Sequence, residues 1–172
     1  TRQENGKWRA GSGAVWSLRS NALRPDTWTS ADAAGLPILP GLLRWKEVRD
    51  DKIDHAIRFT VPQTQRAHLW PARHDAGSTD SVDFPPMGAR FRLSRNFSTA
   101  GYDVHARRVI AAMQTYGLVL ADNGSSWFFQ GEQHSKWPIK LIEQLKTIPA
   151  SQFEAVDTSS LIAGPDSGQV AQ

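Results

Sequence analysis

The sequence contains no cysteine among its 172 residues. Disulfide bonds, a thiol nucleophile, cysteine-ligated zinc and iron–sulfur clusters are therefore excluded. It also lacks any run of about 18 apolar residues, the length that a membrane-spanning helix needs, so we expect no membrane insertion. No internal repeat or low-complexity linker divides the chain, and its length suits one domain of roughly 100–200 residues.

Several motifs of known chemistry are missing as well. The sequence has no HxE, HxH or HExxH spacing for metal ligands and no GxGxxG or Walker loop for a nucleotide. It has no GxSxG turn, which argues against a serine hydrolase. Any metal or catalytic site must therefore be assembled from residues far apart in the chain.

The net charge of +3 is unevenly placed, because the first 24 residues carry five basic side chains against Glu4 alone. Nucleic-acid binding normally needs a basic stripe on the folded body, with aromatic residues among it. The rest of this chain is close to neutral, so we expect no nucleic-acid partner.

Composition divides the chain into three parts. Residues 1–13 are polar and glycine-rich and predict a flexible N-terminal segment, and residues 159–172 predict a flexible C-terminal tail. Residues 14–158 are expected to form a single globular domain. Within it, the stretch 72–88 is full of Gly, Ser, Asp and Pro and predicts a long loop, of the kind that often carries function.

The pattern of apolar residues predicts a mixture of strands and helices. Strands are predicted at 54–61, 66–71, 89–93, 116–121 and 127–130. The second is expected to form a hairpin with the first, and the turn Asn123-Gly124 is expected to join the last two. In the first strand, alternation places His55 on the apolar face with Ile57 and Phe59.

Helix signals complete the fold prediction. Asp103 can cap a helix that Gly117 ends, Pro138 suits the first turn of another, and a short helix is expected at 42–48. Strand pairs interleaved with helices predict an α+β fold. Its core would be a mainly antiparallel sheet or a partly closed barrel, with two or three packed helices.

Five strings of the sequence carry a resemblance to a known family. They are SNALRPDTWTSADAAGLPILPGLLRWKEV (20–48), HAIRFT (55–60), WPARH (70–74), PPMGARFRL (85–93) and YGLVLADNGSSWFFQGE (116–132). In this order they resemble a family of mostly uncharacterised secreted bacterial proteins, with no activity that could be carried over. The resemblance implies a secreted, extracellular protein. Its members have a further upstream segment that reads as strands, which implies an upstream segment or a second chain that completes the sheet.

Three residues are candidates for catalysis. His55 is expected in the core, as a hydrogen-bonded structural histidine or as a general base, and His74 ends a strand where the long loop begins. Asp122 precedes the Asn123-Gly124 turn, either as a turn residue or as the carboxylate of a site. Two histidines and one carboxylate are also the set that a divalent metal would take as cofactor.

The remaining candidates concern substrate binding. Trp70 and Trp127 lie at element ends, where an indole can cover the core or stack on a sugar ring, and Asp83 lies in the long loop. Together with the exported family, these residues favour a carbohydrate-active domain, a hydrolase of a polysaccharide or cell-wall glycan. The alternatives are a non-catalytic glycan-binding module and a structural or assembly protein of the cell exterior.

Overall fold

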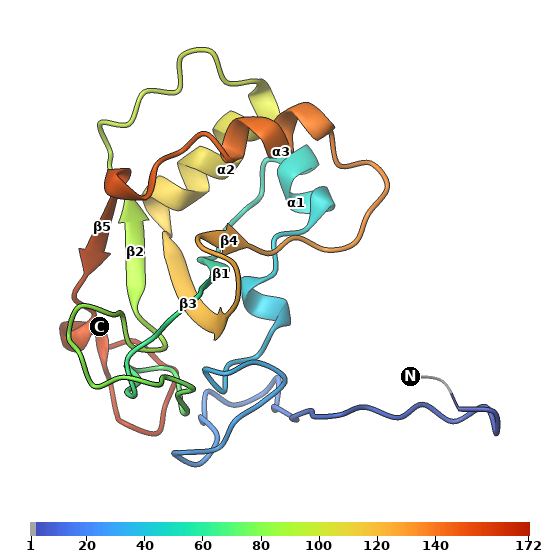
Figure 1. Ribbon diagram of the computed structural model, residues 1–172, viewed down its shortest axis with the longest axis vertical. Helices are drawn as coiled ribbons and strands as arrows, with labels where there is room; N and C mark the ends of the chain where they lie inside the picture. Colours follow the sequence, from blue (N-terminus) through green and yellow to red (C-terminus); the bar gives the residue numbers. More distant parts are fainter. Residues whose placement is uncertain (1–2) are drawn as a thin grey trace.

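The computed structural model describes residues 3–172 and has an α+β fold built on one curled, five-stranded mixed sheet, a half-barrel (Figure 1). The helices are α1 (Trp45–Asp50), α2 (Val104–Thr115) and α3 (Ile139–Leu145), and the strands are β1 (Ile57–Val61), β2 (Arg90–Leu93), β3 (Leu118–Asn123), β4 (Phe128–Phe129) and β5 (Phe153–Val156). Short 3-10 turns lie at Leu39–Gly41, Ala150–Gln152 and Ser159–Leu161. The predicted fold class is confirmed.

The strand order is β4-β1-β3-β2-β5. Three of the neighbouring pairs are antiparallel, as expected, but β1 and β3 are parallel. The predicted hairpin through Asn123-Gly124 is wrong, because β1 lies between β3 and β4 and pairs with both. The Asn123-Gly124 turn connects β3 to β4 along the chain, but β4 pairs with β1 on the side away from β3.

The predicted strand 66–71 is also wrong. That segment contributes one isolated bridge, from His68 to Met87, and a second bridge joins Gln65, just before it, to Thr79. Its partners lie in the loop that follows, so the pairing is local and never joins the main sheet. The peptide bond between Trp70 and Pro71, at the end of this segment, is cis.

The helix signals are confirmed. The Asp103 side chain accepts a hydrogen bond of 2.8 Å from the Ala106 amide, which caps α2. Gly117 follows α2 with φ of +74°, and a Cβ there would lie 2.4 Å from the Phe91 carbonyl oxygen, so only glycine fits. Pro138 is the N-cap of α3, and α1 begins three residues later than the predicted 42–48 helix.

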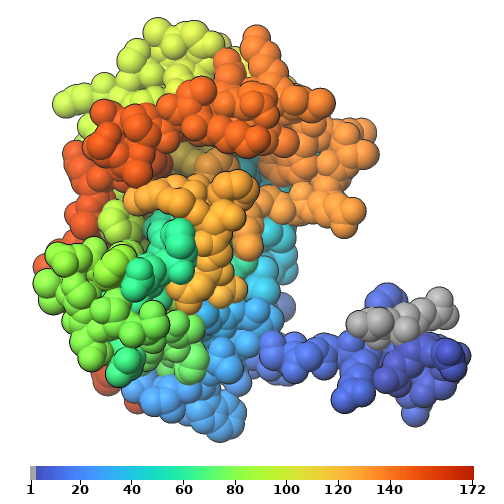
Figure 2. Space-filling view, in the orientation of Figure 1, coloured from blue at the N-terminus to red at the C-terminus, as the bar shows by residue number. Residues whose placement is uncertain are grey.

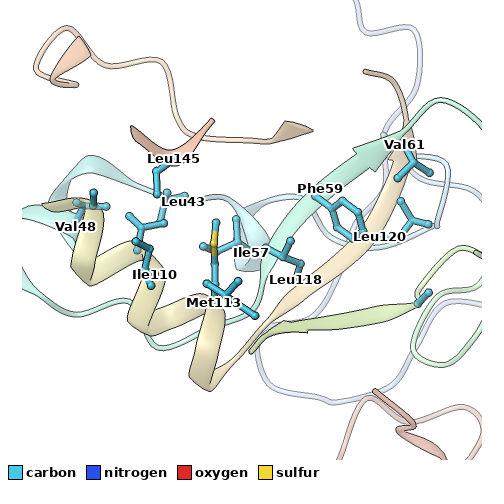
Figure 3. Packing of buried hydrophobic residues seen from close by; sticks show 14 of the residues in the cluster. Leu43, Val48, Ile57, Phe59, Val61, Ile110, Met113, Leu118, Leu120 and Leu145 are labelled. Carbon is cyan, nitrogen blue, oxygen red and sulfur yellow. The ribbon is translucent and has the colours of Figure 1, made fainter. Parts of the chain in front are cut away.

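The apolar core lies between the helices and one face of the sheet. Ile110 and Met113 of α2 pack toward Ile57 of β1 and Leu118 of β3, as Figure 3 shows. All four are at most 1 % exposed, and full burial of such side chains contributes about 1.5–3 kcal/mol each. We call this side of the sheet the helix face and the opposite side the far face.

The first and last segments of the described chain lie at its periphery. Residues 3–13 run away from the body of the molecule, while the C-terminal segment passes beside the loops that follow β1 (Figure 1). That segment is held there, since Trp70 Nε1 donates to the Ser167 carbonyl at 2.7 Å and Arg73 bonds to Asp166. The flexibility predicted for both ends stays a prediction, and residues 1–2 lie outside the described part. None of the helices within residues 3–172 has the length and apolar character to cross a bilayer.

Candidate functional site

A row of side chains crosses the far face of the sheet. Arg58 of β1 is paired with Val119 of β3, and Val119 with Arg90 of β2. Cross-strand partners point to the same face, and neighbouring strands lie about 4.8 Å apart. Two arginines therefore project side by side, with one valine between them and about 10 Å between their backbones.

The loop formed by residues 30–41 covers this row of side chains. The buried carboxylate of Asp32 holds the loop in place through hydrogen bonds. Asp32 Oδ1 accepts from the Leu36 amide at 3.0 Å and from the Ser30 hydroxyl at 3.1 Å. Burial raises the pKa of Asp32, against the opposing effects of Arg58, the Leu36 amide and Ser30. Gly41 lets the loop backbone pack closely over Arg58, because a Cβ at this position would lie only 3.1 Å from the Cβ of Arg58.

Arg58 forms a buried ion pair and also lies on the wall of the site. Its Nη2 donates to Asp32 Oδ2 at 3.0 Å, and the residue is only 5 % exposed. Its Nε is buried and has no hydrogen-bond partner among residues 3–172. A buried N–H without an acceptor costs about 1–3 kcal/mol. The same holds for Arg92 Nε and Trp45 Nε1, so this feature by itself does not mark a ligand site.

The guanidinium of Arg90 has no hydrogen-bond or ion-pair partner within the described residues. It is partly buried, and burial alone lowers the pKa of its guanidinium. Arg92, two residues along the same strand and on the same face, pairs with Glu154 of β5 at 3.1 Å. The cross-strand neighbours of Arg90 are Val119 and Val156, so its charge is left uncompensated.

His55 lies at the edge of the same site, and the expectation that it shares the apolar face is wrong. The strand begins only at Ile57, so alternation does not reach His55. Its Nδ1 lies 2.9 Å from the Ala56 carbonyl oxygen and its Nε2 3.3 Å from Glu47 Oε2. Both ring nitrogens of His55 are thus in contact with groups of the protein itself.

These residues line a small cavity of about 220 Å³, which we call the arginine pocket. Its walls are Asp32, Leu36, Pro37, Pro40, Gly41, His55, Ala56, Arg58, Arg90, Val119 and Ala121. Two guanidinium groups and one buried carboxylate leave an excess of positive charge. The pocket can therefore hold an anionic group, because planar guanidinium donors form strong, bidentate hydrogen bonds with such groups.

The structure does not gather the three predicted catalytic residues. Asp122 pairs with Thr60 near the C-terminal end of β1, whereas His55 precedes the N-terminal end of that strand. At about 3.3 Å per residue the two are separated by roughly 15 Å. Within residues 3–172 no three His, Asp or Glu side chains lie close enough to hold a metal ion.

His74 and Asp122 each have a local partner. The Nδ1 of His74 donates to the Ala33 carbonyl at 2.8 Å. Asp122 Oδ1 accepts from the amide of Asn123 at 2.9 Å, as a turn residue does. Neither side chain lines the arginine pocket.

The predicted sugar-binding residues lie elsewhere too. Trp70 uses its indole N–H to hold the C-terminal segment, through the Ser167 carbonyl. Asp83 is exposed in the long loop, where it accepts from the Ser81 hydroxyl at 2.9 Å. Neither one contributes to the walls of the arginine pocket.

Trp127 lies in an aromatic cluster on the helix face. Its ring is stacked on Phe59, with 4.9 Å between centroids, and contacts Phe91 and Phe153. Its backbone has φ of +53°, which is rare for so large a side chain. The ring packing stabilises this conformation, so the position of Trp127 is dictated by the core.

A second, apolar hollow of about 550 Å³ lies beside Trp127. In Figure 2 the surface is hollowed between the segment with α3 and the segment with β4. The two charged side chains on its walls are already engaged, since Glu132 Oε1 accepts from the Trp45 amide and Lys146 pairs with Glu143. The unpaired charge is in the arginine pocket, which is the candidate site.

In comparisons with known proteins, no family model, curated protein or solved structure matches this chain. The resemblance to secreted bacterial proteins therefore stays a prediction.

The sequence analysis did not single out Arg58, Arg90 or Asp32. For Arg58 one signal was present, because it lies between the apolar residues Ile57 and Phe59 in a strand, and all five residues of that strand are buried in the structure. A charged residue in such a strand needs a buried partner. The partner and the second arginine depend on strand order, which periodicity does not give.

Proposed function

We propose that this chain is a non-catalytic domain that binds acidic glycans and anchors their anionic groups in the arginine pocket. The observation that carries the proposal is the guanidinium of Arg90, which is partly buried without a partner beside Arg58. An uncompensated charge at this position costs stability, and a bound anion would repay that cost.

Binding is favoured over catalysis by the state of the ionisable groups. General acid–base chemistry needs a group that can exchange a proton with the substrate. In the arginine pocket, Asp32 is committed to Arg58, Leu36 and Ser30. His55 has both nitrogens on acceptors. The pocket thus offers guanidinium donors, while its carboxylate and its histidine are already engaged with groups of the protein.

The glycan assignment combines the pocket with the expectation from the sequence. A cavity of about 220 Å³ is smaller than the roughly 300–1,000 Å³ of sites for drug-sized ligands. The cavity can take one acidic group or one sugar ring, with the rest of the polysaccharide outside it. The resemblance to secreted bacterial proteins supports an extracellular partner, and polysaccharides with acidic sugars supply repeated anionic groups there.

The test is a calorimetric titration with oligogalacturonate and with the same oligosaccharide after its carboxyl groups have been reduced to alcohols. We expect the acidic form to bind and the neutral form to bind at least tenfold more weakly. Arg90→Gln should weaken binding of the acidic form by about 10- to 100-fold, since a charge-assisted hydrogen bond contributes about 1.5–3 kcal/mol. The matched control is Arg92→Gln, on the same strand and face but already paired with Glu154.

Arg92→Gln should bind like the wild type. Equal binding by wild type and Arg90→Gln, or equal binding of the acidic and neutral oligosaccharides, would overturn the proposal.

A further inference from the structure

An exposed tryptophan lies beside the arginine pocket. Trp28 is 55 % exposed, whereas tryptophan side chains are on average highly buried. The backbone carbonyl of Trp28 packs against Gly35, where a Cβ would lie only 2.6 Å from the carbonyl oxygen. Gly35 has φ of +71° and directly precedes Leu36, which lines the arginine pocket. Trp28 therefore packs on the same loop, residues 30–41, that forms a wall of the pocket.

The indole of Trp28 is held by contacts with its neighbours. The guanidinium carbon of Arg24 lies 5.3 Å from the centroid of the Trp28 ring and 5.5 Å from that of Trp16, within the range of cation–π contacts. Arg24 Nη1 also donates to the Thr29 carbonyl, which fixes the guanidinium. Since Trp28 is still more than half exposed, a large part of its ring is open to solvent in a fixed position.

The backbone that presents Trp28 is strained. Residues 25–28 form a turn in which the Trp28 amide donates to the Pro25 carbonyl at 3.3 Å. Thr27, the third residue of this turn, has φ of +67°, a conformation that glycine and asparagine adopt far more easily than a β-branched residue. Strained residues of this kind are concentrated at ligand-binding sites. The turn is therefore a second, independent reason to assign a function to Trp28.

We infer that Trp28 is a second sugar subsite, on which one ring of a polysaccharide stacks while an acidic group of the same polysaccharide occupies the arginine pocket. The inference rests on the proposed function, because it extends that site across the loop of residues 30–41. An indole suits this role, since its broad apolar face can cover the apolar face of a sugar ring. The arginine pocket takes one ring at most, so the neighbouring sugars bind outside it.

The experiment compares galacturonate with oligogalacturonates of increasing length, each titrated calorimetrically into the full chain. Trp28→Ala should weaken binding of the longer oligosaccharides by about three- to tenfold, the range that an aromatic contact contributes. It should leave binding of galacturonate unchanged, because a single sugar in the pocket does not reach the indole. Longer polyanions also gain affinity from repeated charges, so the decisive quantity is the difference between wild type and Trp28→Ala at each length.

Two further variants make the outcome specific. Trp8→Ala is the matched control, because Trp8 is 80 % exposed in the N-terminal segment that runs away from the body of the molecule (Figure 1). It should bind every oligosaccharide like the wild type. Trp28→Phe keeps an aromatic ring and should retain most of the affinity for the longer oligosaccharides. Thermal unfolding of each variant verifies that it is folded.

The results separate the inference from the proposed function. If Trp28→Ala binds the longer oligosaccharides as tightly as the wild type, Trp28 is not a subsite and the arginine pocket alone binds the glycan. If it weakens galacturonate as much as the longer oligosaccharides, Trp28 acts on the pocket through Gly35, and the inference is wrong. If Arg90→Gln binds all these ligands like the wild type, the proposed function itself is wrong.

Discussion

Arg58 and Arg90 lie on the same face of the sheet, on either side of Val119. Arg58 has a buried acid, Asp32, at 3.0 Å, whereas Arg90 has no acid among the described residues. The two arginines have the same side chain, but the positive charge of Arg58 is neutralised by an acid and that of Arg90 is not. This difference separates a structural charge from one available to a ligand, and the following predictions test it.

Arg90→Gln should leave stability unchanged or raise it slightly. A partly buried cation without a partner contributes nothing favourable to folding, and binding sites often cost stability in this way. We expect the free energy of unfolding in urea to change by less than about 0.5 kcal/mol, or to rise. A loss of more than about 1 kcal/mol would identify Arg90 as a structural residue.

Arg58→Ala should be strongly destabilising. It leaves the carboxylate of Asp32 buried and without its cation, and removal of one partner of a buried ion pair costs about 3–5 kcal/mol. The control is Lys46→Ala, which breaks an exposed pair with Asp50 and should cost less than about 0.5 kcal/mol. Urea unfolding of the two variants gives both numbers, and similar small losses in both would contradict the structural role of Arg58.

Glu47 should make stability depend on pH. Burial opposes ionisation of Glu47, but Arg44 and His55 outweigh it and hold its pKa below the ordinary value of 4.5. A carboxyl with a lowered pKa in the folded state stabilises the fold above its unfolded pKa, and this contribution is lost as the pH falls through the folded pKa.

The variant that tests this is Glu47→Gln, which keeps a capping side chain at the start of α1 but removes the charge. It should be less stable than the wild type by about 1–3 kcal/mol at pH 7. The gap should close in acid unfolding experiments below pH 4.5. A gap that does not depend on pH would show that the charge of Glu47 has no such role.

Trp127→Ala should affect stability and leave glycan affinity unchanged. The ring fills the space between Phe59, Phe91 and Phe153, and truncation of a large aromatic side chain costs about 3–5 kcal/mol when it is fully buried. Since Trp127 is partly exposed, we expect about 2–4 kcal/mol in thermal unfolding. Trp28→Ala, at a position 55 % exposed, should cost less than about 1 kcal/mol. Lower oligogalacturonate affinity with unchanged stability would instead make Trp127 a sugar platform.

The fold class, the helices and most strands could be predicted because their signals are local. Asp103 and Gly117 mark the ends of α2 by their own backbone requirements. Alternation marks β1 whatever its neighbours are. Strand order is different, because it depends on packing between distant segments, and Asn123-Gly124 predicted a hairpin where β1 in fact intervenes.

The candidate site could not be predicted for the same reason. Arg58 and Arg90 are 32 positions apart and meet only because β3 lies between their strands. His55 was singled out and does line the arginine pocket, although its ring is held by Glu47 and Ala56. His74 and Asp122 stood out by residue type and turn context, which say nothing about distance in space.

The most direct measurement is a crystal structure of the chain soaked with a galacturonate oligosaccharide, because it shows where the acidic group binds. The account predicts both carboxylate oxygens of one sugar within hydrogen-bond distance of the Arg90 guanidinium, with the Arg58–Asp32 pair intact. A sugar bound in the apolar hollow beside Trp127, or around His74 and Asp122, with the arginine pocket empty, would contradict it.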